Sequence, residues 1–418
     1  MPPPNQVRRF FSNLGPGLIS GAADDDPSGI STYSVAGASF GYLPLWTALF
    51  SFPLMSAVQL MCARLGMVTG LGLAGVIRRR YSRWVLWLAC ALLLVANVIN
   101  IAADLGGMAA ATRMVTGARA ELTVPLYGMA IVAMLMWSSY RAIARVFKWL
   151  TLVLLAYVVT AFVAHVDWRS ALQATIVPRV EWSRSFFSLL VAILGTTISP
   201  YLFFWQAAQE VEEERAMGRD FAHRQGATPD ELSTCRTDVM TGMFASNAIM
   251  YFVILTTAAT LHARGLTSIT TAQQAAEALR PIAGSGAYWL FTLGLIGTGM
   301  LAVPVLAGSC AYAIAEASNW RGSLDWKPWE AERFYLVLSA SVMLGIGLTY
   351  AGFDAIALLF TTAVINGVLA PPLVLIVVLL TSDRTVMGDA ANSPVLSVFG
   401  WIAFAAMAAA AVGLGITS

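Results

Sequence analysis

Long apolar runs separated by short polar segments form the main pattern of this 418-residue chain. Each run is long enough to cross a bilayer as an α-helix, which needs about 20 predominantly apolar residues. We predict eleven membrane spans and no separate soluble domain, so residues 1–418 form a single transmembrane domain. The spans are expected at about 13–40, 43–63, 84 to beyond 107, 122–139, 146–165, 186–212, 238–262, 287–317, 333–350, 355–381 and 394–416.

Two of these spans are interrupted in the same way. "DDDPSG" breaks the first span around Pro27, and "GTTISPYLFFWQ" breaks the sixth around Pro200. If residues of about 13–165 and 186–381 form two five-helix repeats, with 394–416 as an extra helix, the breaks occupy equivalent positions. An odd number of helices in each repeat makes the second inverted relative to the first. Paired broken helices in inverted halves indicate a midplane substrate site in secondary transporters. Simple proline kinks are the alternative, but they leave three adjacent aspartates unexplained.

Composition supports an all-α polytopic membrane protein. The chain is 58% hydrophobic and 11% charged, whereas soluble domains have about 25% charged residues. A net charge of +2 implies no nucleic-acid partner. Four cysteines without a CxxC or zinc spacing are expected to be buried. We expect no enzymatic activity, no cofactor and no obligatory protein partner.

The basic residues predict the orientation. With the N-terminus in the cytoplasm, 18 of the 25 Lys and Arg residues fall on the inner side, which agrees with the positive-inside rule. Eleven spans then place the C-terminus outside, in a plasma (inner) membrane. The inner set comprises Arg8, Arg9, Arg64, Arg78, Arg79, Arg80, Arg83, Arg141, Arg145, Lys148, Arg215, Arg219, Arg224, Arg236, Arg321, Lys327, Arg333 and Arg384.

The aspartates Asp24, Asp25 and Asp26 are the first candidates for binding chemistry. On a continuous helix they would splay around the circumference, but in an unwound segment they can point in separate directions. Carboxylates at membrane depth are functional candidates, and oxygen ligands suit Mg²⁺, Mn²⁺ or Ca²⁺. A protonatable carboxylate would equally serve a proton-coupled transporter of an organic solute.

Other polar positions fall on helical faces. Asn97, Asn100 and Asp104 share one face of the third span, where they line a permeation path or bond between helices. Gln206 and Glu210 belong to a polar stripe that leads to three glutamates at 212–214, either an acidic vestibule or a helix end balancing nearby arginines. "TPDE" at 228–231 predicts a short helix in a solvated loop at about 213–237.

The chain resembles the Nramp family of divalent metal transporters over nearly its whole length. "GPGLISGAADDDPSG" is similar to the family's first helix, whose signature is Asp-Pro-Gly-Asn. "SNAIMYFVILTTAATLHARG", "LFTLGLIGTGMLAVPVLAGSCAYAIAE" and "TSDRTVMGD" resemble its seventh helix, its eighth helix and the loop after its tenth. The resemblance implies a LeuT-type fold of two inverted five-helix repeats, with helices one and six broken.

Departures from the family pattern concern its metal and proton ligands. Gly29 stands at the family's metal-binding asparagine, and Ser199-Pro200-Tyr201 stands at its Met-Pro-His. Gln206 takes the place of its second histidine, and Gly107 that of its helix-three glutamate. On helix ten the family's glutamine falls near Thr362 or Ala363, with Asn366 as a nearby amide. Replacing a thioether by a hydroxyl leaves a harder site, and fewer ligands suit an ion that keeps waters, as Mg²⁺ does.

The pattern is most similar to the Nramp-related magnesium transporters, which implies Mg²⁺ and/or Mn²⁺ import without proton coupling. Proton-coupled Mn²⁺/Fe²⁺ import, a metal sensor and an organic-solute transporter are the alternatives. The expected ion ligands are Asp26, Ala23, Gly29, Thr196, Ser199 and Asn366. The expected permeation path or vestibule comprises Asp24, Asp25, Asn100, Asp104, Tyr201, Gln206 and Glu210.

Overall fold

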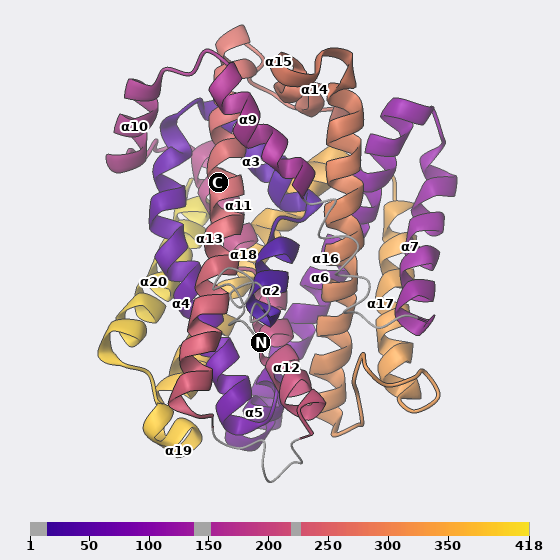
Figure 1. The fold of residues 1–418 in the computed structure, drawn as a ribbon, viewed down its shortest axis with the longest axis vertical. Coiled ribbons are helices and arrows are strands. Elements are labelled where there is room, and N and C mark those ends of the chain that lie inside the picture. Colours follow the sequence, from indigo (N-terminus) through magenta and orange to yellow (C-terminus); the bar gives the residue numbers. More distant parts are fainter. Residues whose placement is uncertain (1–14, 138–151, 219–226, 418) are drawn as a thin grey trace, which may run out of the picture.

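The computed structural model describes residues 15–137, 152–218 and 227–417, and the regular structure in these ranges is helical (Figure 1). Nine stretches of this part of the chain are long and apolar enough to cross a membrane. They agree with nine of the predicted spans. Their helices are α4 (Trp46–Thr69), α6 (Arg83–Thr116), α7 (Ala120–Trp137), α11 (Arg184–Thr197) with α12 (Pro200–Ala216), α13 (Pro229–Thr260), α16 (Ala287–Ser318), α17 (Glu332–Thr349), α18 (Ala355–Ser382) and α20 (Pro394–Ile416).

The remaining two predicted spans have a different form. The first consists of α2 (Pro16–Asp24) and α3 (Pro27–Phe40), with its beginning at 13–14 outside the described residues. Of the fifth, the structure describes α9 (Leu155–Val163) with the turn before it. Residues 146–151 of that span lie outside the described ranges. A bend of 119° separates α9 with its preceding turn from α10 (Trp168–Ile176).

Both proline breaks have nearly the same backbone. Asp25 and Ile198 follow the first half-helices with ψ of 52° and 60°. Asp26 and Ser199 come next with extended backbones, ψ 170° and 128°, and a proline then starts the second half-helix. Proline disfavours helical backbone in the preceding residue and lacks an N–H, so it ends one helix and begins another.

Small residues bring the first broken span close to α13. A Cβ on Gly21 would lie 2.3 Å from the carbonyl oxygen of Gly242, and one on Gly242 would lie 2.1 Å from that of Gly17. Gly17 and Gly21 are four residues apart and so share a face of α2. Such small residues let membrane helices approach at backbone distance. The half-helix α2, which precedes the break in the first span, therefore packs directly against α13.

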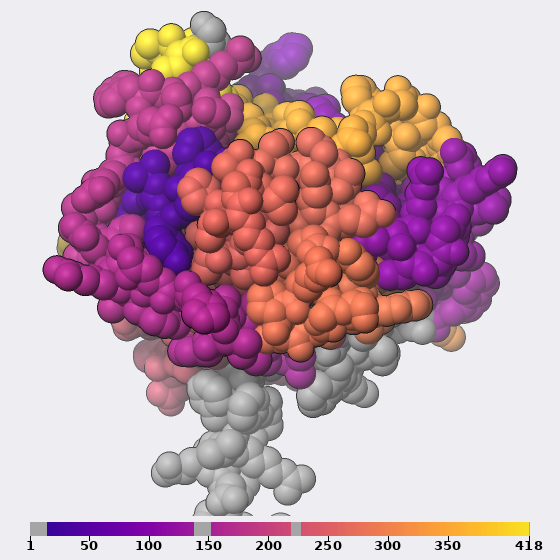
Figure 2. All heavy atoms as spheres, turned by 90° about the horizontal axis from the view of Figure 1, so that it is seen from above, coloured from indigo at the N-terminus to yellow at the C-terminus, as the bar shows by residue number. Residues whose placement is uncertain are grey.

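Segments predicted to be cytoplasmic meet at one end of the molecule, beside α5 (Leu73–Arg80) and α19 (Arg384–Met387) (Figure 1). Arg80 pairs with Asp383 at 2.9 Å, and the side chain of Arg78 donates to Asn319 at 2.8 Å. At the opposite end lie α10, α14 (Ala272–Ala276) and α15 (Arg280–Ala283). Figure 2 views this second end, where the segment between α13 and α16 covers the middle of the face. The basic residues Arg8, Arg9, Arg141, Arg145, Lys148, Arg219 and Arg224, used in the orientation argument, lie outside the described residues.

The predicted helix start at Thr228 is confirmed, but the length of that helix is not. Thr228 accepts a hydrogen bond from the Glu231 N–H, and Glu231 accepts one from the Thr228 N–H. The prediction of a separate short helix is wrong, because α13 continues without a break from Pro229 to Thr260. Its first turns extend the seventh span instead. All four cysteines are buried and free, as expected.

Candidate metal-binding site

Asp26 starts the second half of the first broken span. Its Oδ1 accepts hydrogen bonds from the Gly29 N–H and the Ser28 hydroxyl, both at 2.7 Å. The carboxylate thus caps α3, where the positive end of the helix dipole stabilises negative charge. Its other oxygen, Oδ2, accepts from Asn100 at 2.8 Å. Gly29, which was expected to be an ion ligand, donates its backbone N–H to Asp26 in this conformation. Its backbone therefore orients the Asp26 carboxylate.

Asn100 joins three helices at the centre of the site. Its amide nitrogen donates to Asp26 Oδ2 and, at 3.3 Å, to Asp104 Oδ2. Its amide oxygen accepts from Thr362 and Asn366, both at 3.1 Å. These contacts bring α3, α6 and α18 together around two carboxylates. Asn366 therefore reaches the site through Asn100, and Thr362 joins the same cluster.

Asp24 and Asp25 face a different helix. The hydroxyl of Ser246 on α13 donates to Asp24 Oδ2 at 2.8 Å and lies 3.2 Å from Asp25 Oδ1. The break therefore presents carboxylates in two directions, toward α6 and toward α13. Asp24 and Asp104 are 0% exposed, Asp25 is 4% and Asp26 is 2%, so this conformation is closed around all four.

The remaining expected ligands make hydrogen bonds of their own. The Tyr201 hydroxyl donates to the carbonyl of Ala23 at 3.0 Å and so links the two broken spans. The Ser199 hydroxyl donates to the carbonyls of Gly195 and Thr196, at 3.0 and 2.7 Å. Ser199 thus satisfies the free carbonyls at the end of α11. In this closed conformation the hydroxyl oxygens of Tyr201 and Ser199 and the carbonyl oxygens of Ala23 and Thr196 are therefore hydrogen-bonded within the protein.

Gln206 and Glu210 lie farther along α12, beside α2 and α13. Gln206 accepts from Ser20 of α2 at 2.5 Å and donates to Glu210 at 2.8 Å. Asp238 of α13 binds the start of α2, where it accepts from the N–H groups of Gly15, Gly17 and Leu18 at 2.8, 2.6 and 3.2 Å. These contacts hold α2 in place at the end of the molecule predicted to be cytoplasmic.

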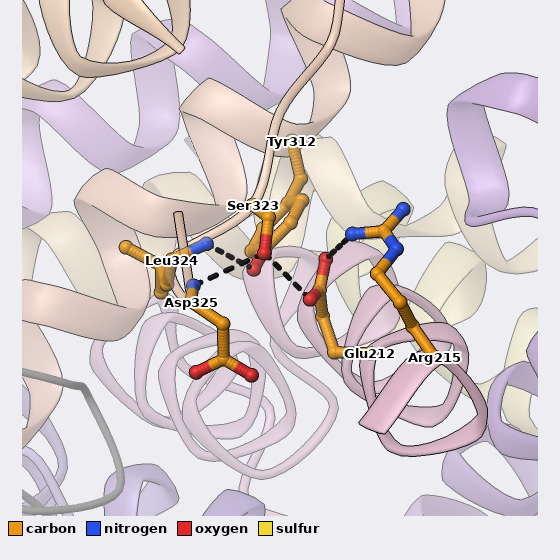
Figure 3. A network of polar contacts seen from close by, with 6 residues as sticks. All are labelled: Glu212, Arg215, Tyr312, Ser323, Leu324 and Asp325. Atoms are coloured by element: carbon orange, nitrogen blue, oxygen red, sulfur yellow. Dashed lines mark hydrogen bonds and ion pairs between the residues drawn. The ribbon is translucent and has the colours of Figure 1, made fainter. Parts of the chain in front are cut away.

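Farther toward that end, a polar network closes the space between α12 and the segment after α16 (Figure 3). Glu212 accepts from Arg215 at 2.7 Å and from Ser323 at 2.6 Å. The Leu324 N–H donates to the Tyr312 hydroxyl at 3.1 Å. Glu212 is thus a paired and buried member of the helix end, one of the two interpretations considered for the glutamates at 212–214.

An open cavity of about 870 Å³ lies at the opposite end, between α6, α14 and α18. Ala102 and Gly106 of α6 and Leu358 of α18 line it. Leu358 is four residues, about one helical turn, from Thr362. The cavity therefore reaches to about a turn from the cluster around Asn100. Three charged residues, Arg113, Glu121 and Asp354, also line it.

Gly107, at the position of the family's helix-three glutamate, faces Leu359. A Cβ at Gly107 would lie 2.9 Å from Leu359 Cδ1, so the leucine occupies the space of a side chain. Within the described residues, no three His, Cys, Asp or Glu side chains are arranged to hold a metal. In this conformation the four buried carboxylates are thus divided between two sides of the break.

Three residues at or near the candidate site were not identified from the sequence: Ser246, Tyr33 and Asp238. Ser246 and Asp238 lie on α13, whose sequence from Asp238 onward is otherwise largely apolar, so a polar residue at membrane depth was the available signal. Tyr33 resembles a packing residue in sequence. Its hydroxyl is buried without a hydrogen-bond partner among the described residues, which only the structure reveals.

Comparisons with known proteins find relatives that match most of the chain. A divalent metal cation transporter MntH of Aeromonas hydrophila subsp. hydrophila is 27% identical over 409 residues, covering 94% of this chain and 93% of the relative. Another MntH, from Caldanaerobacter subterraneus subsp. tengcongensis, is 23% identical and covers 94% and 90%.

Two solved structures share the fold. A manganese transporter of Eremococcus coleocola, in complex with an aromatic bis-isothiourea substituted compound, has a TM-score of 0.76 at 19% identity over 100% of this chain and 88% of the other. Mhp1, a nucleobase-cation-symport-1 family transporter, has a TM-score of 0.56 at 12% identity over 97% and 92%. The LeuT-type fold that the family resemblance implies is confirmed. Since the family model "Natural resistance-associated macrophage protein-like" matches residues 17–417, the chain belongs to the Nramp family.

Proposed function

We propose that this protein imports divalent metal cations, Mg²⁺ and/or Mn²⁺, by alternating access and without proton coupling. The observation that carries the proposal is the pair of carboxylates, Asp26 and Asp104, joined by Asn100 at the broken helix. A dication that enters between them would meet oxygen ligands from Asp26, Asp104 and the neighbouring amides. The names of the MntH relatives and of the manganese transporter support a divalent metal as the cargo.

The position of the open cavity supports entry of the ion from that end of the molecule. That cavity ends about one helical turn from Thr362. At the other end, α2 is held by Asp238, and α12 by Ser20 and Ser323. In the proposed cycle these contacts break, α2 and α12 move, and the ion leaves toward the cytoplasm. The N-terminus is proposed to lie on that side.

The absence of proton coupling is supported by the residues at the family's proton-carrying positions. Gly107 replaces a glutamate and adjoins Leu359, while Tyr201 and Gln206 replace histidines. The membrane potential supplies about 4.6 kcal/mol for a dication at 100 mV. That corresponds to an accumulation of about 10³-fold without a coupled ion.

Uptake into proteoliposomes tests the proposal. Mg²⁺ and Mn²⁺ are expected to enter when a potassium diffusion potential makes the interior negative, and Ca²⁺ and Fe²⁺ are added as competitors. An internal pH dye should report no acidification. Asp26→Ala should abolish the flux, whereas Asp167→Asn, an exposed cap of α10, should leave it unchanged. Absence of flux, or equal flux in Asp26→Ala, would contradict the proposal.

Proton-coupled Mn²⁺/Fe²⁺ import is the second candidate function. It is favoured by one observation: Asp104 Oδ1 is buried and has no hydrogen-bond partner among the described residues, so this oxygen has room for a proton. Acidification of the liposome interior in step with metal uptake, and its loss in Asp104→Asn, would establish this candidate and reject uncoupled transport.

A further inference from the structure

We propose that Asp24 and Asp25, together with Ser246 and Tyr33, form a second subsite for a divalent cation on the α13 side of the first break. The inference deepens the proposed function and rests on it, because it describes a second ion within the same transport site. It concerns the two carboxylates that the cluster around Asn100 does not use.

The break separates its carboxylates into two groups. Asp26 turns to Asn100 on α6. Asp24 and Asp25 turn to the single hydroxyl of Ser246 on α13. Since Asp24 and Asp26 are two residues apart, their Cα atoms lie no more than about 7 Å apart. The two groups are therefore neighbours, but they face different helices.

One carboxylate oxygen of this second group and the hydroxyl of Tyr33 on α3 are buried without hydrogen-bond partners among the described residues. Asp24 Oδ1 and the Tyr33 hydroxyl are both in fully buried side chains and make no hydrogen bond to any residue the structure describes. Unsatisfied buried oxygens are costly, and a bound cation would satisfy both the carboxylate and, through a water or directly, the phenol.

Gly29 shows how closely these groups surround the break. A Cβ on Gly29 would lie 3.4 Å from the Asp24 carbonyl oxygen and from Asp26 Oδ1, and 3.5 Å from Tyr33 Cε2. The Asp24 carbonyl oxygen and the ring edge of Tyr33 thus both border the same position at Gly29. A carbonyl, two carboxylates, a hydroxyl and a phenol form an all-oxygen environment, which Mg²⁺ and Mn²⁺ accept.

Charge balance gives the second argument. Within the described residues, the hydrogen-bond donors to the four aspartates are neutral groups, namely Ser28, Gly29, Asn100 and Ser246. Ion pairs with arginine are formed elsewhere in the described residues, by Asp383, Glu212 and Glu277. One dication matches the charge of Asp26 with Asp104. A second dication matches that of Asp24 with Asp25.

Mn²⁺ binding measured by electron paramagnetic resonance tests this subsite on the purified full chain. The wild type is expected to bind two Mn²⁺ per chain and to show dipolar broadening from two nearby ions. The double variant Asp24→Asn/Asp25→Asn should bind one Mn²⁺ without broadening. Asp26→Asn should also retain one. Ser246→Ala, which keeps every carboxylate, should weaken the second ion about tenfold and decides the question if the double variant does not fold. Asp167→Asn is the matched control and should bind two.

Several results would overturn the second subsite: one Mn²⁺ in the wild type, two in the double variant, or unchanged binding in Ser246→Ala. If NaCl releases one Mn²⁺ and choline chloride at the same ionic strength does not, the position binds a monovalent ion. That result would also reject the divalent subsite. The proposed function fails separately. Wild-type uptake with one bound ion rejects only the subsite, whereas two bound ions without uptake reject only transport.

Discussion

The two broken spans have the same backbone and opposite chemistry. In each, two residues separate the half-helices and a proline begins the second half. Asp26 caps α3 through the Gly29 N–H and reaches Asn100 on another helix. Ser199, at the matching position, does not cap α12 and donates back to carbonyls of α11. The first break therefore presents charge, while the second satisfies its own backbone.

This difference shows that an inverted repeat constrains shape more than function. Proline at the start of a half-helix produces the break in both repeats. The side chain before the proline then determines whether the break carries a carboxylate, as at Asp26, or a hydroxyl, as at Ser199. The four aspartates at the first break and in the cluster around Asn100, namely Asp24, Asp25, Asp26 and Asp104, all come from the first repeat.

The largest expected effect is the difference between two variants. One removes the charge at the first break, and the other removes the hydroxyl at the second. Asp26→Asn keeps a residue that caps helices well but removes the carboxylate, so metal uptake should fall by more than about 100-fold. Ser199→Ala removes hydrogen bonds within one helix end and should change uptake less than about threefold. Radiometric or dye-based uptake by proteoliposomes compares the two. Equal losses would show that both breaks supply essential ligands.

Close packing at the first break predicts the next effect. In Gly242→Ala the new Cβ would lie 2.1 Å from the Gly17 carbonyl oxygen, so α2 must shift away from α13. Overpacking of this kind costs about 1–3 kcal/mol. We expect a lower melting temperature and faster labelling of a cysteine introduced at Ile19. Gly415→Ala in α20, which meets nothing within 4 Å, is the control. An unchanged melting profile and labelling rate in Gly242→Ala would contradict the close contact.

A smaller effect is expected from Asp238→Asn. The carboxylate of Asp238 accepts three N–H groups at the start of α2, and hydrogen bonds to charged groups contribute about 1.5–3 kcal/mol each. The amide retains one acceptor oxygen, so labelling at Ile19→Cys should rise about tenfold. Asp167→Asn, which removes an exposed cap of α10, should not change it. A labelling rate equal to that of the wild type would mean that α2 is held by packing alone.

The smallest effect concerns ion preference at the second break. Ser199→Met introduces a thioether beside the site, and sulfur favours Mn²⁺ over Mg²⁺. The Mn²⁺/Mg²⁺ uptake ratio should rise by about tenfold, or about 1.4 kcal/mol. Ser199→Leu adds a side chain of similar volume without sulfur, so it distinguishes the effect of the thioether from the effect of side-chain size. A similar change in both variants would show that the second break selects ions by space only.

Much of the fold could be predicted from the chain alone. The apolar runs, the prolines at 27 and 200 and the cap at Thr228 are local signals, and each appears in the structure where the sequence placed it. The separate helix predicted before α13 was wrong, because a capping box marks where a helix begins and says nothing about where it ends.

The candidate site was less predictable. Asp26, Asn100, Asp104 and Asn366 were named from the sequence and meet in one cluster, through contacts as distant as Asn366 with Asn100. Thr196 and Ser199 were also named, but their hydroxyls are engaged within α11. The partner of Asp24 and Asp25, Ser246, lies 222 positions beyond Asp24. No local pattern links such positions.

The sequence by itself determined that the chain spans a membrane, where its two helices break and that carboxylates cluster at the first break. These follow from hydropathy, from the fixed φ of proline and from the identity of consecutive residues, all properties of short segments. Only the tertiary structure decided which aspartate faces which helix. That choice depends on close approach of α2 to α13 and on a single amide between α3, α6 and α18, and such contacts exist only after the helices pack.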